Sequence, residues 1–201
     1  MHALLASKWT KTAAFLLSLA PLGTLGWRAY HGNLTANPIE FVTHATGDWT
    51  LRFLLITLAV TPLRKLPGLA NLIRLRRMFG LFAFFYGCLH FITYIWFDKF
   101  FDVQEMWKDV TIRRFITAGA LAFFLMIPLA LTSTAGWVRR LGGRNWQRLH
   151  RAIYFSAAAG VIHYVWLVKS DLRAPLTYGA ILAVLLTWRV AIWLMKRRAS
   201  V

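Results

Sequence analysis

Acidic residues and cysteine are scarce in this chain. Of its 201 residues only seven are Asp or Glu, and Cys88 is the single cysteine. One cysteine excludes a disulfide within the chain and a zinc site built from several cysteines. The sequence also lacks a Gly-x-Gly-x-x-Gly segment, so we expect no fused nucleotide-binding domain and a separate source of electrons or hydride.

Hydrophobic and basic residues are abundant. The sequence is 58% hydrophobic, and 24 Lys and Arg residues give it a net charge of +17. In a soluble protein such a charge would indicate nucleic-acid binding. Here the basic residues lie between apolar runs of about 20 residues, the length that crosses a bilayer as a helix. We therefore expect contact with membrane lipid, no nucleic-acid partner, and an all-α integral membrane protein.

The apolar runs predict a six-transmembrane helix bundle. The N-terminal run is interpreted as an uncleaved first span, and no repeat or second domain is visible, so residues 1–201 form one expected domain. None of the expected spans contains an acidic residue. They cover about 12–30, 49–63, 78–97, 112–131, 150–168 and 176–195.

The distribution of charge predicts the orientation of the bundle. The N-terminus, the 64–77 and 139–151 loops and the C-terminus are rich in Lys and Arg and contain no acid, whereas all seven acids lie in the other connections. Cytoplasmic loops carry the excess of Lys and Arg. We therefore expect both the N- and the C-terminus in the cytoplasm.

Two histidines lie inside expected spans at matching depth. At 1.5 Å per residue, His90 lies about 18 Å and His163 about 20 Å from the inner ends of the third and fifth spans. Each follows a glycine by three residues, Gly87 and Gly160, which could leave room for a flat macrocycle on the same helical face. Facing imidazoles with an apolar, aromatic lining suit a heme between the third and fifth helices.

A less specific interpretation stays open for these residues. An intramembrane histidine can simply form a hydrogen bond with a neighbouring helix, and glycine at helix contacts is common packing. His150 lies at the inner boundary beside Arg148, where it could ligate a second heme or contact a propionate, a lipid phosphate or a flavin phosphate. Arg76 and Arg77 occupy the corresponding level of the third span, which offers no second histidine there.

The arrangement of histidines resembles a known family. Six spans, with one histidine on the third and two on the fifth separated by thirteen residues, resemble the ferric-reductase-like transmembrane domain of NADPH oxidases and ferric reductases. Within that superfamily, residues 145–151 (Asn-Trp-Gln-Arg-Leu-His-Arg) and Tyr154 resemble the MsrQ (YedZ) family. Its members are the heme-binding membrane subunits of a bacterial periplasmic methionine-sulfoxide reductase system.

The resemblance implies cofactors and partners. It implies heme b bound by His90, His150 and His163, an FMN whose site the residues do not indicate, and a bacterial inner-membrane location. It further implies electron delivery to MsrP, a periplasmic molybdopterin subunit that reduces methionine sulfoxide in oxidised proteins, from the quinone pool or a cytoplasmic flavin reductase. Two-heme relatives carry two histidines on the third span, so a second heme stays open here. Arg77 and Arg148 are candidates for contacting anionic cofactor groups.

Three functions follow from these observations. An electron-transfer subunit is favoured, because two axial imidazoles leave the iron without an open position. A stand-alone ferric or quinone reductase is the alternative enzyme. A cofactor-free permease or scaffold is disfavoured, because transporters more often carry acidic residues within their spans.

Overall fold

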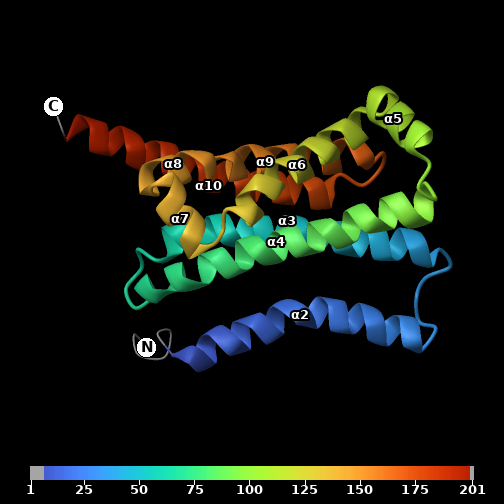
Figure 1. The fold of residues 1–201 in the computed structure, drawn as a ribbon, viewed down its shortest axis with the longest axis horizontal. Coiled ribbons are helices and arrows are strands. Elements are labelled where there is room, and N and C mark those ends of the chain that lie inside the picture. The colour runs from blue at the N-terminus through green and yellow to red at the C-terminus, as the bar shows by residue number, and fades with distance from the viewer. Residues whose placement is uncertain (1–6, 200–201) are drawn as a thin grey trace.

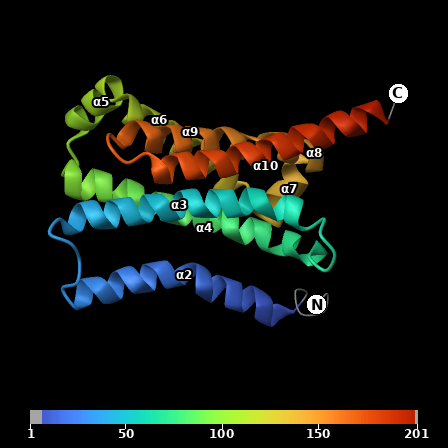
Figure 2. The ribbon, with the colours of Figure 1, turned by 180° about the vertical axis from the view of Figure 1, so that it is seen from behind.

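The chain folds as a bundle of long helices that lie side by side (Figures 1 and 2). The computed structural model describes residues 7–199, and every regular element in that range is helical. The long helices are α2 (Lys8–Tyr30), α3 (Pro38–Leu63), α4 (Ile73–Thr93), α6 (Arg114–Leu131), α9 (Ala152–Leu167) and α10 (Arg173–Arg198).

Short elements connect the long helices at the two ends of the bundle. The short helices α7 (Ala135–Leu141) and α8 (Gly143–Leu149) lie at one end, near the start of α2 and the end of α10, whereas α5 (Val103–Ile112) lies at the other (Figure 1). A 3-10 turn, η1 (Ala70–Leu72), precedes α4, and a π-helical segment, η2 (Tyr94–Asp98), continues it. The first and last described helices therefore begin and end on the same side.

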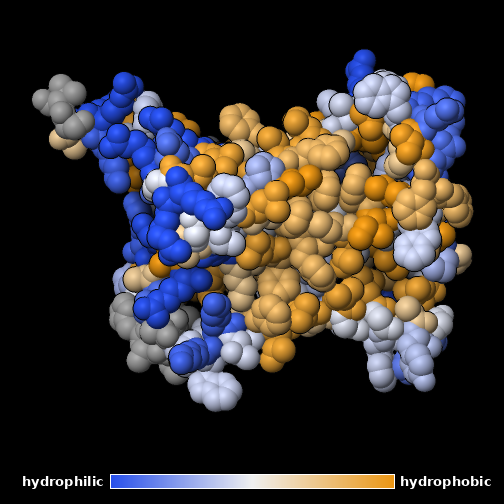
Figure 3. Space-filling model, in the orientation of Figure 1, coloured by the Kyte–Doolittle hydropathy of each residue, from blue (hydrophilic) through white to orange (hydrophobic). Residues whose placement is uncertain are grey.

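The outer surface of the bundle is that of a protein embedded in lipid. A broad apolar band separates two hydrophilic ends (Figure 3), and apolar side chains such as Leu17 and Phe155 point outward. Within the described residues, three helices are long and apolar enough to cross a membrane, Ala70–Asp98, Arg114–Leu131 and Arg173–Arg198. Helices satisfy their own backbone hydrogen bonds, which is what the bilayer interior requires.

Helix α3 starts eleven residues before the second expected span. Asn37 caps it: its side chain accepts a hydrogen bond from the Glu40 backbone N–H (3.3 Å) and donates to Glu40 Oε2 (3.0 Å). Pro38 occupies the first turn, where its missing N–H costs nothing. The sequence interpretation put Asp48 in a polar connection, whereas the structure places it in α3. A permease was disfavoured because no expected span contains an acidic residue. Asp48 lies on a long helix of the bundle, which weakens that argument.

The long helices associate as two closely packed pairs. Helix α3 packs along α4, and α6 packs along α9. Small residues such as Ala122 and Ala157 let α6 and α9 approach, and Ser156 Oγ donates a hydrogen bond to the Ala122 carbonyl across that contact (2.8 Å). Small residues and interhelical hydrogen bonds are the usual means of helix association in membranes.

One buried tyrosine ties α2 to the rest of the bundle. The Tyr86 hydroxyl, on α4, accepts a hydrogen bond from the Leu22 backbone N–H (3.2 Å) and donates to the Ser18 carbonyl (2.9 Å). These two backbone groups are the pair that an undisturbed α-helix would join. They flank Pro21, which disturbs the helix at that turn. The Tyr86 hydroxyl therefore bridges the Leu22 N–H and the Ser18 carbonyl within α2, and at the same time it attaches α2 to α4.

Replacing Tyr86 by Phe should therefore destabilise the protein. The change removes both hydrogen bonds and leaves buried backbone groups of α2 without that partner, which costs about 1–3 kcal/mol. We expect a lower thermal denaturation midpoint of the purified protein in detergent. Tyr30→Phe, on the exposed end of α2, is the matched control and should leave the midpoint unchanged. Equal midpoints for both variants would contradict this role of Tyr86.

Candidate functional site

His90 and His163 meet between the two helix pairs. His90 projects from α4, and its Nδ1 lies 2.9 Å from the Thr43 carbonyl of α3. His163 projects from α9, and its Nδ1 lies 2.7 Å from the Phe115 carbonyl of α6. A carbonyl oxygen only accepts, so each Nδ1 must be the protonated, donating nitrogen. Each neutral ring then presents the lone pair of Nε2 as its free ligand atom.

The distance between the two rings suits a shared metal. Their centroids are 6.1 Å apart, and the ring planes are inclined by 75°. A metal bound by two imidazoles at about 2 Å each spans about 4 Å between nitrogens, and the rings extend beyond that on either side. Histidine ligands commonly donate their second N–H to a backbone carbonyl, as both rings do here. The donor set therefore fits the two axial positions of a heme.

A glycine faces each imidazole from the neighbouring helix. A methyl group at Gly47 would lie 3.1 Å from His90 Nδ1, and one at Gly119 would lie 2.7 Å from His163 Nδ1. Each glycine follows the accepting carbonyl by four residues: Thr43 precedes Gly47, and Phe115 precedes Gly119. The absent Cβ lets the ring reach the carbonyl one turn earlier. Sequence reasoning missed this repeated arrangement, whose only signal is two glycines at the depth of the histidines.

The glycines that the sequence singled out occupy different positions. A Cβ at Gly87 would meet Met126 Cε of α6 at 3.0 Å. A Cβ at Gly160 would meet Leu51 Cδ1 of α3 at 3.7 Å. Both therefore lie at contacts between helix pairs, the packing role that was left open for them. The structure does not bring either of them against an imidazole.

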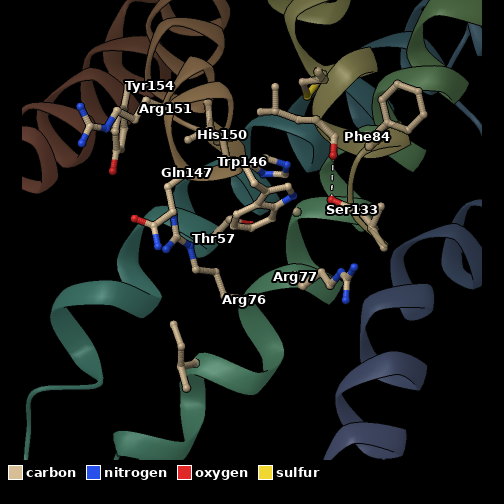
Figure 4. A pocket seen from close by; sticks show the side chains of 17 residues that line it. Thr57, Arg76, Arg77, Phe84, Ser133, Trp146, Gln147, His150, Arg151 and Tyr154 are labelled. Atoms are coloured by element: carbon tan, nitrogen blue, oxygen red, sulfur yellow. Dashed lines mark hydrogen bonds between the residues drawn. The ribbon is translucent and has the colours of Figure 1, made fainter. Parts of the chain in front are cut away.

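His150 lies apart from this site, in a cavity of 490 Å³ (Figure 4). It ends α8, stacks on Trp146 with 3.8 Å between ring centroids, and its Nε2 lies 3.0 Å from Thr132 Oγ1. Trp146 Nε1 in turn donates to the Thr132 carbonyl (2.8 Å). Two neighbouring contacts thus fix the ring of His150 at the wall of the cavity.

Three arginines give this cavity a positive lining. Arg76 and Arg77 come from α4, and Arg151 follows His150 (Figure 4). Arg77 is thus where the sequence suggested, whereas Arg148 is exposed on α8 and does not line the cavity. Arg151 takes the place expected for Arg148, because α8 ends at Leu149 and the chain turns at His150 and Arg151 before α9 begins at Ala152.

The described residues contain no larger cluster of metal-ligating side chains beside these histidines. Among residues 7–199, no group of three or more His, Cys, Asp or Glu side chains is placed to hold a metal ion. Cys88 is a half-buried free thiol on α4. The candidate metal site therefore consists of two imidazoles, which suits a metal whose other ligands come from a macrocycle.

Comparison with known proteins identifies the family. Residues 46–161 match the model of the ferric reductase like transmembrane component. Three relatives are each named protein-methionine-sulfoxide reductase heme-binding subunit MsrQ. That of Herminiimonas arsenicoxydans is 56% identical over 94% of this chain and 88% of its own length. This chain belongs to the MsrQ family. The relatives from Azospira oryzae (54%, over 90% and 78%) and Caulobacter vibrioides (49%, over 92% and 88%) agree.

Membership of the MsrQ family confirms the resemblance inferred from the fifth span. The matched range contains His90, His150 and both ring-facing glycines, and it ends two residues before His163. The alignment with the relatives covers nearly the whole chain. A multi-pass, ferric-reductase-like membrane domain is therefore the architecture of this protein.

Gly119→Ala should disturb the site specifically. The new methyl group would overlap His163 Nδ1 at 2.7 Å and push the ring away from the Phe115 carbonyl. Loss of such an outer partner typically lowers metal affinity about 10–100-fold, so we expect a lower heme content, read from the Soret absorbance per mole of protein. Gly160→Ala is the control, since its Cβ would make only an ordinary contact with Leu51. A normal heme content in Gly119→Ala would exclude this role.

Proposed function

We propose that this protein is a heme b subunit of the membrane that relays electrons to a periplasmic methionine-sulfoxide reductase. The observation that carries the proposal is the pair His90 and His163, whose Nδ1 atoms are held by backbone carbonyls 2.9 and 2.7 Å away. The name of the MsrQ relatives supports the heme and the reductase system.

His90 and His163 are the residues that would hold the heme iron. The Thr43 and Phe115 carbonyls keep the proton of each ring on Nδ1, so each Nε2 stays available to the metal. A heme held by these two residues would supply one-electron transfer. Gly47 and Gly119 make room for the rings, while Gly87 and Gly160 hold the neighbouring helices close around the cofactor.

The cavity beside His150 is the proposed site of a second cofactor, either a second heme or FMN. Its flat Trp146–His150 stack suits a planar ring system, and Arg76, Arg77 and Arg151 favour propionate or phosphate groups. Arg148, exposed on the same turn, is proposed to attract such groups or lipid phosphates from outside. Because His150 Nε2 contacts Thr132 Oγ1, iron ligation there would require that hydroxyl to turn away.

The proposed topology has six spans in a single domain, residues 1–201, of a bacterial inner membrane. The start of α4 and the end of α8, next to which the arginines around His150 lie, are at the same end of the bundle as the start of α2 and the end of α10 (Figure 1). By the positive-inside rule this end faces the cytoplasm. His90 and His163 then lie in the periplasmic half, on the side of the proposed acceptor.

The proposed partners are MsrP and a separate electron donor. MsrP, a periplasmic molybdopterin subunit, would use the electrons to repair oxidised periplasmic proteins. The donor would be the quinone pool or a cytoplasmic flavin reductase. A stand-alone ferric or quinone reductase is the second candidate, supported by the match to the ferric reductase like component.

Ligand assignment can be tested by absorption spectroscopy. We expect His90→Ala and His163→Ala each to abolish the low-spin heme spectrum of the periplasmic-half site, because one imidazole cannot fill both axial positions. His44→Ala, on α3, is the control and should retain it. Purified protein without any Soret band would refute heme binding, and a full band in both ligand variants would refute these ligands.

The electron acceptor that reoxidises the heme faster distinguishes the two candidate functions. The protein is reduced with dithionite, freed of excess reductant, and mixed under anaerobic conditions with MsrP plus methionine sulfoxide or with a ferric chelate. We expect reoxidation of the heme to be faster with MsrP. Faster reoxidation by the ferric chelate would instead favour the stand-alone reductase.

A further inference from the structure

A second cavity, of 310 Å³, lies between α2 and α3 on the periplasmic half of the proposed topology. Its lining combines flat aromatic and charged side chains, namely Arg28 from α2 and Phe41, Asp48, Trp49 and Arg52 from α3. Helix α2 contacts the bundle mainly through α4. The cavity is therefore bordered by the long helix that packs least closely against the rest of the bundle.

The charged groups in this cavity are paired with each other and with aromatic rings. Arg52 Nη2 lies 3.5 Å from Asp48 Oδ2, and Arg52 Nε donates to the Tyr178 hydroxyl (2.8 Å). The Arg28 guanidinium lies over the Phe41 ring at 4.6 Å, and that of Arg52 over Trp49 at 4.7 Å. Ionisable groups on a membrane helix are costly and indicate a functional role.

The cavity and the imidazole site lie on opposite sides of α3. Residues 41, 45, 48, 49 and 52 form one stripe of the helix and line the cavity. Thr43 and Gly47 contact His90 from another face of the same turns. A helix with its side chains is about 10 Å across. A ring in the cavity would therefore lie about one helix diameter from a proposed heme ligand.

We propose that this cavity binds the head group of a membrane-soluble hydroquinone and that Asp48 accepts a proton from it. The inference rests on the proposed function, for which it assigns the site of the electron donor. Phe41 and Trp49 line the cavity with aromatic rings, each of which already has an arginine over one face. Asp48 is a proton acceptor for one ring hydroxyl, and Arg28 and Arg52 are donors for the carbonyl oxygen of the oxidised form.

The electrons and protons that the hydroquinone loses are all accounted for without a further reagent. The hydroquinone loses two electrons and two protons and becomes the quinone. One proton passes to the Asp48 carboxylate and the other to water at the periplasmic surface. The two electrons would leave one at a time toward the site that His90 and His163 would hold, where a bound heme would supply one-electron transfer to the proposed acceptor.

Photolabelling tests the site directly. An azido-quinone is illuminated with the full-length protein in detergent, and labelled peptides are identified by mass spectrometry. We expect labelling within residues 41–52 and near Arg28, suppressed by excess unlabelled short-chain quinone. Labelling confined to the cavity of His150 would overturn the assignment, as would labelling that competing quinone leaves unchanged. Suppression by anionic phospholipid but not by quinone would identify the cavity as a lipid site instead.

Reduction kinetics test the role of Asp48. We expect heme reduction by a short-chain hydroquinone to slow about a hundredfold in Asp48→Asn, the scale of a lost general base. Ala45→Leu keeps the carboxylate but fills the cavity, and should both slow reduction and abolish photolabelling. Glu40→Gln, an exposed acid on the same helix, is the control. Wild-type rates in both Asp48→Asn and Ala45→Leu would overturn the proposal.

Dithionite separates this inference from the proposed function. It should reduce the heme equally in every variant, so slow reduction by hydroquinone alone assigns the defect to the donor site. If the purified protein contains no heme, the proposed function fails, whereas photolabelling still reports whether the cavity binds a quinone. A heme that dithionite reduces and hydroquinone does not, in the unmodified protein, would refute this inference and leave the relay intact.

Discussion

The orientation of two imidazoles by two backbone carbonyls is the constraint on which the site depends. His90 and His163 would rotate freely in an apolar cleft, and a buried ring N–H without a partner would be costly. The Thr43 and Phe115 carbonyls remove both problems, since each carbonyl has a second lone pair beyond its helical bond. A Cβ on the residue one turn later would crowd the ring, by overlap at Gly119 (2.7 Å) and by a tight contact at Gly47 (3.1 Å). Gly47 and Gly119 therefore belong to the geometry of the site together with the histidines.

Depth counting along the chain could predict the meeting of His90 and His163, because rise per residue is nearly invariant in a helix. It could not identify the glycines that face them, because that depends on how neighbouring helices are rotated and shifted, which one sequence does not encode in any local pattern. Gly87 and Gly160 each precede one of these histidines by three residues in the sequence. Their Cβ positions instead face Met126 and Leu51 on other helices.

The beginning of α3 is an element that the sequence interpretation placed wrongly, for a different reason. Residues 31–48 were interpreted as a polar connection because of their composition, yet Asn37, Pro38 and Glu40 form a recognisable helix start. The local capping signal was present and was outweighed by average polarity. The extended helix carries Asp48 and its partner Arg52 into the bundle. This charged pair on α3 could not be predicted as long as hydropathy alone defined the spans.

Each histidine and its carbonyl partner belong to the same helix pair: α3 and α4 hold His90, and α6 and α9 hold His163. Each helix pair therefore contains one histidine together with the carbonyl that orients its imidazole. During synthesis the first half is made before the second, and neither needs the other to orient its ring. The proposed heme would then join two helix pairs that each already hold their own ligand. Its binding would strengthen the contact between the pairs and leave the packing within each pair unchanged.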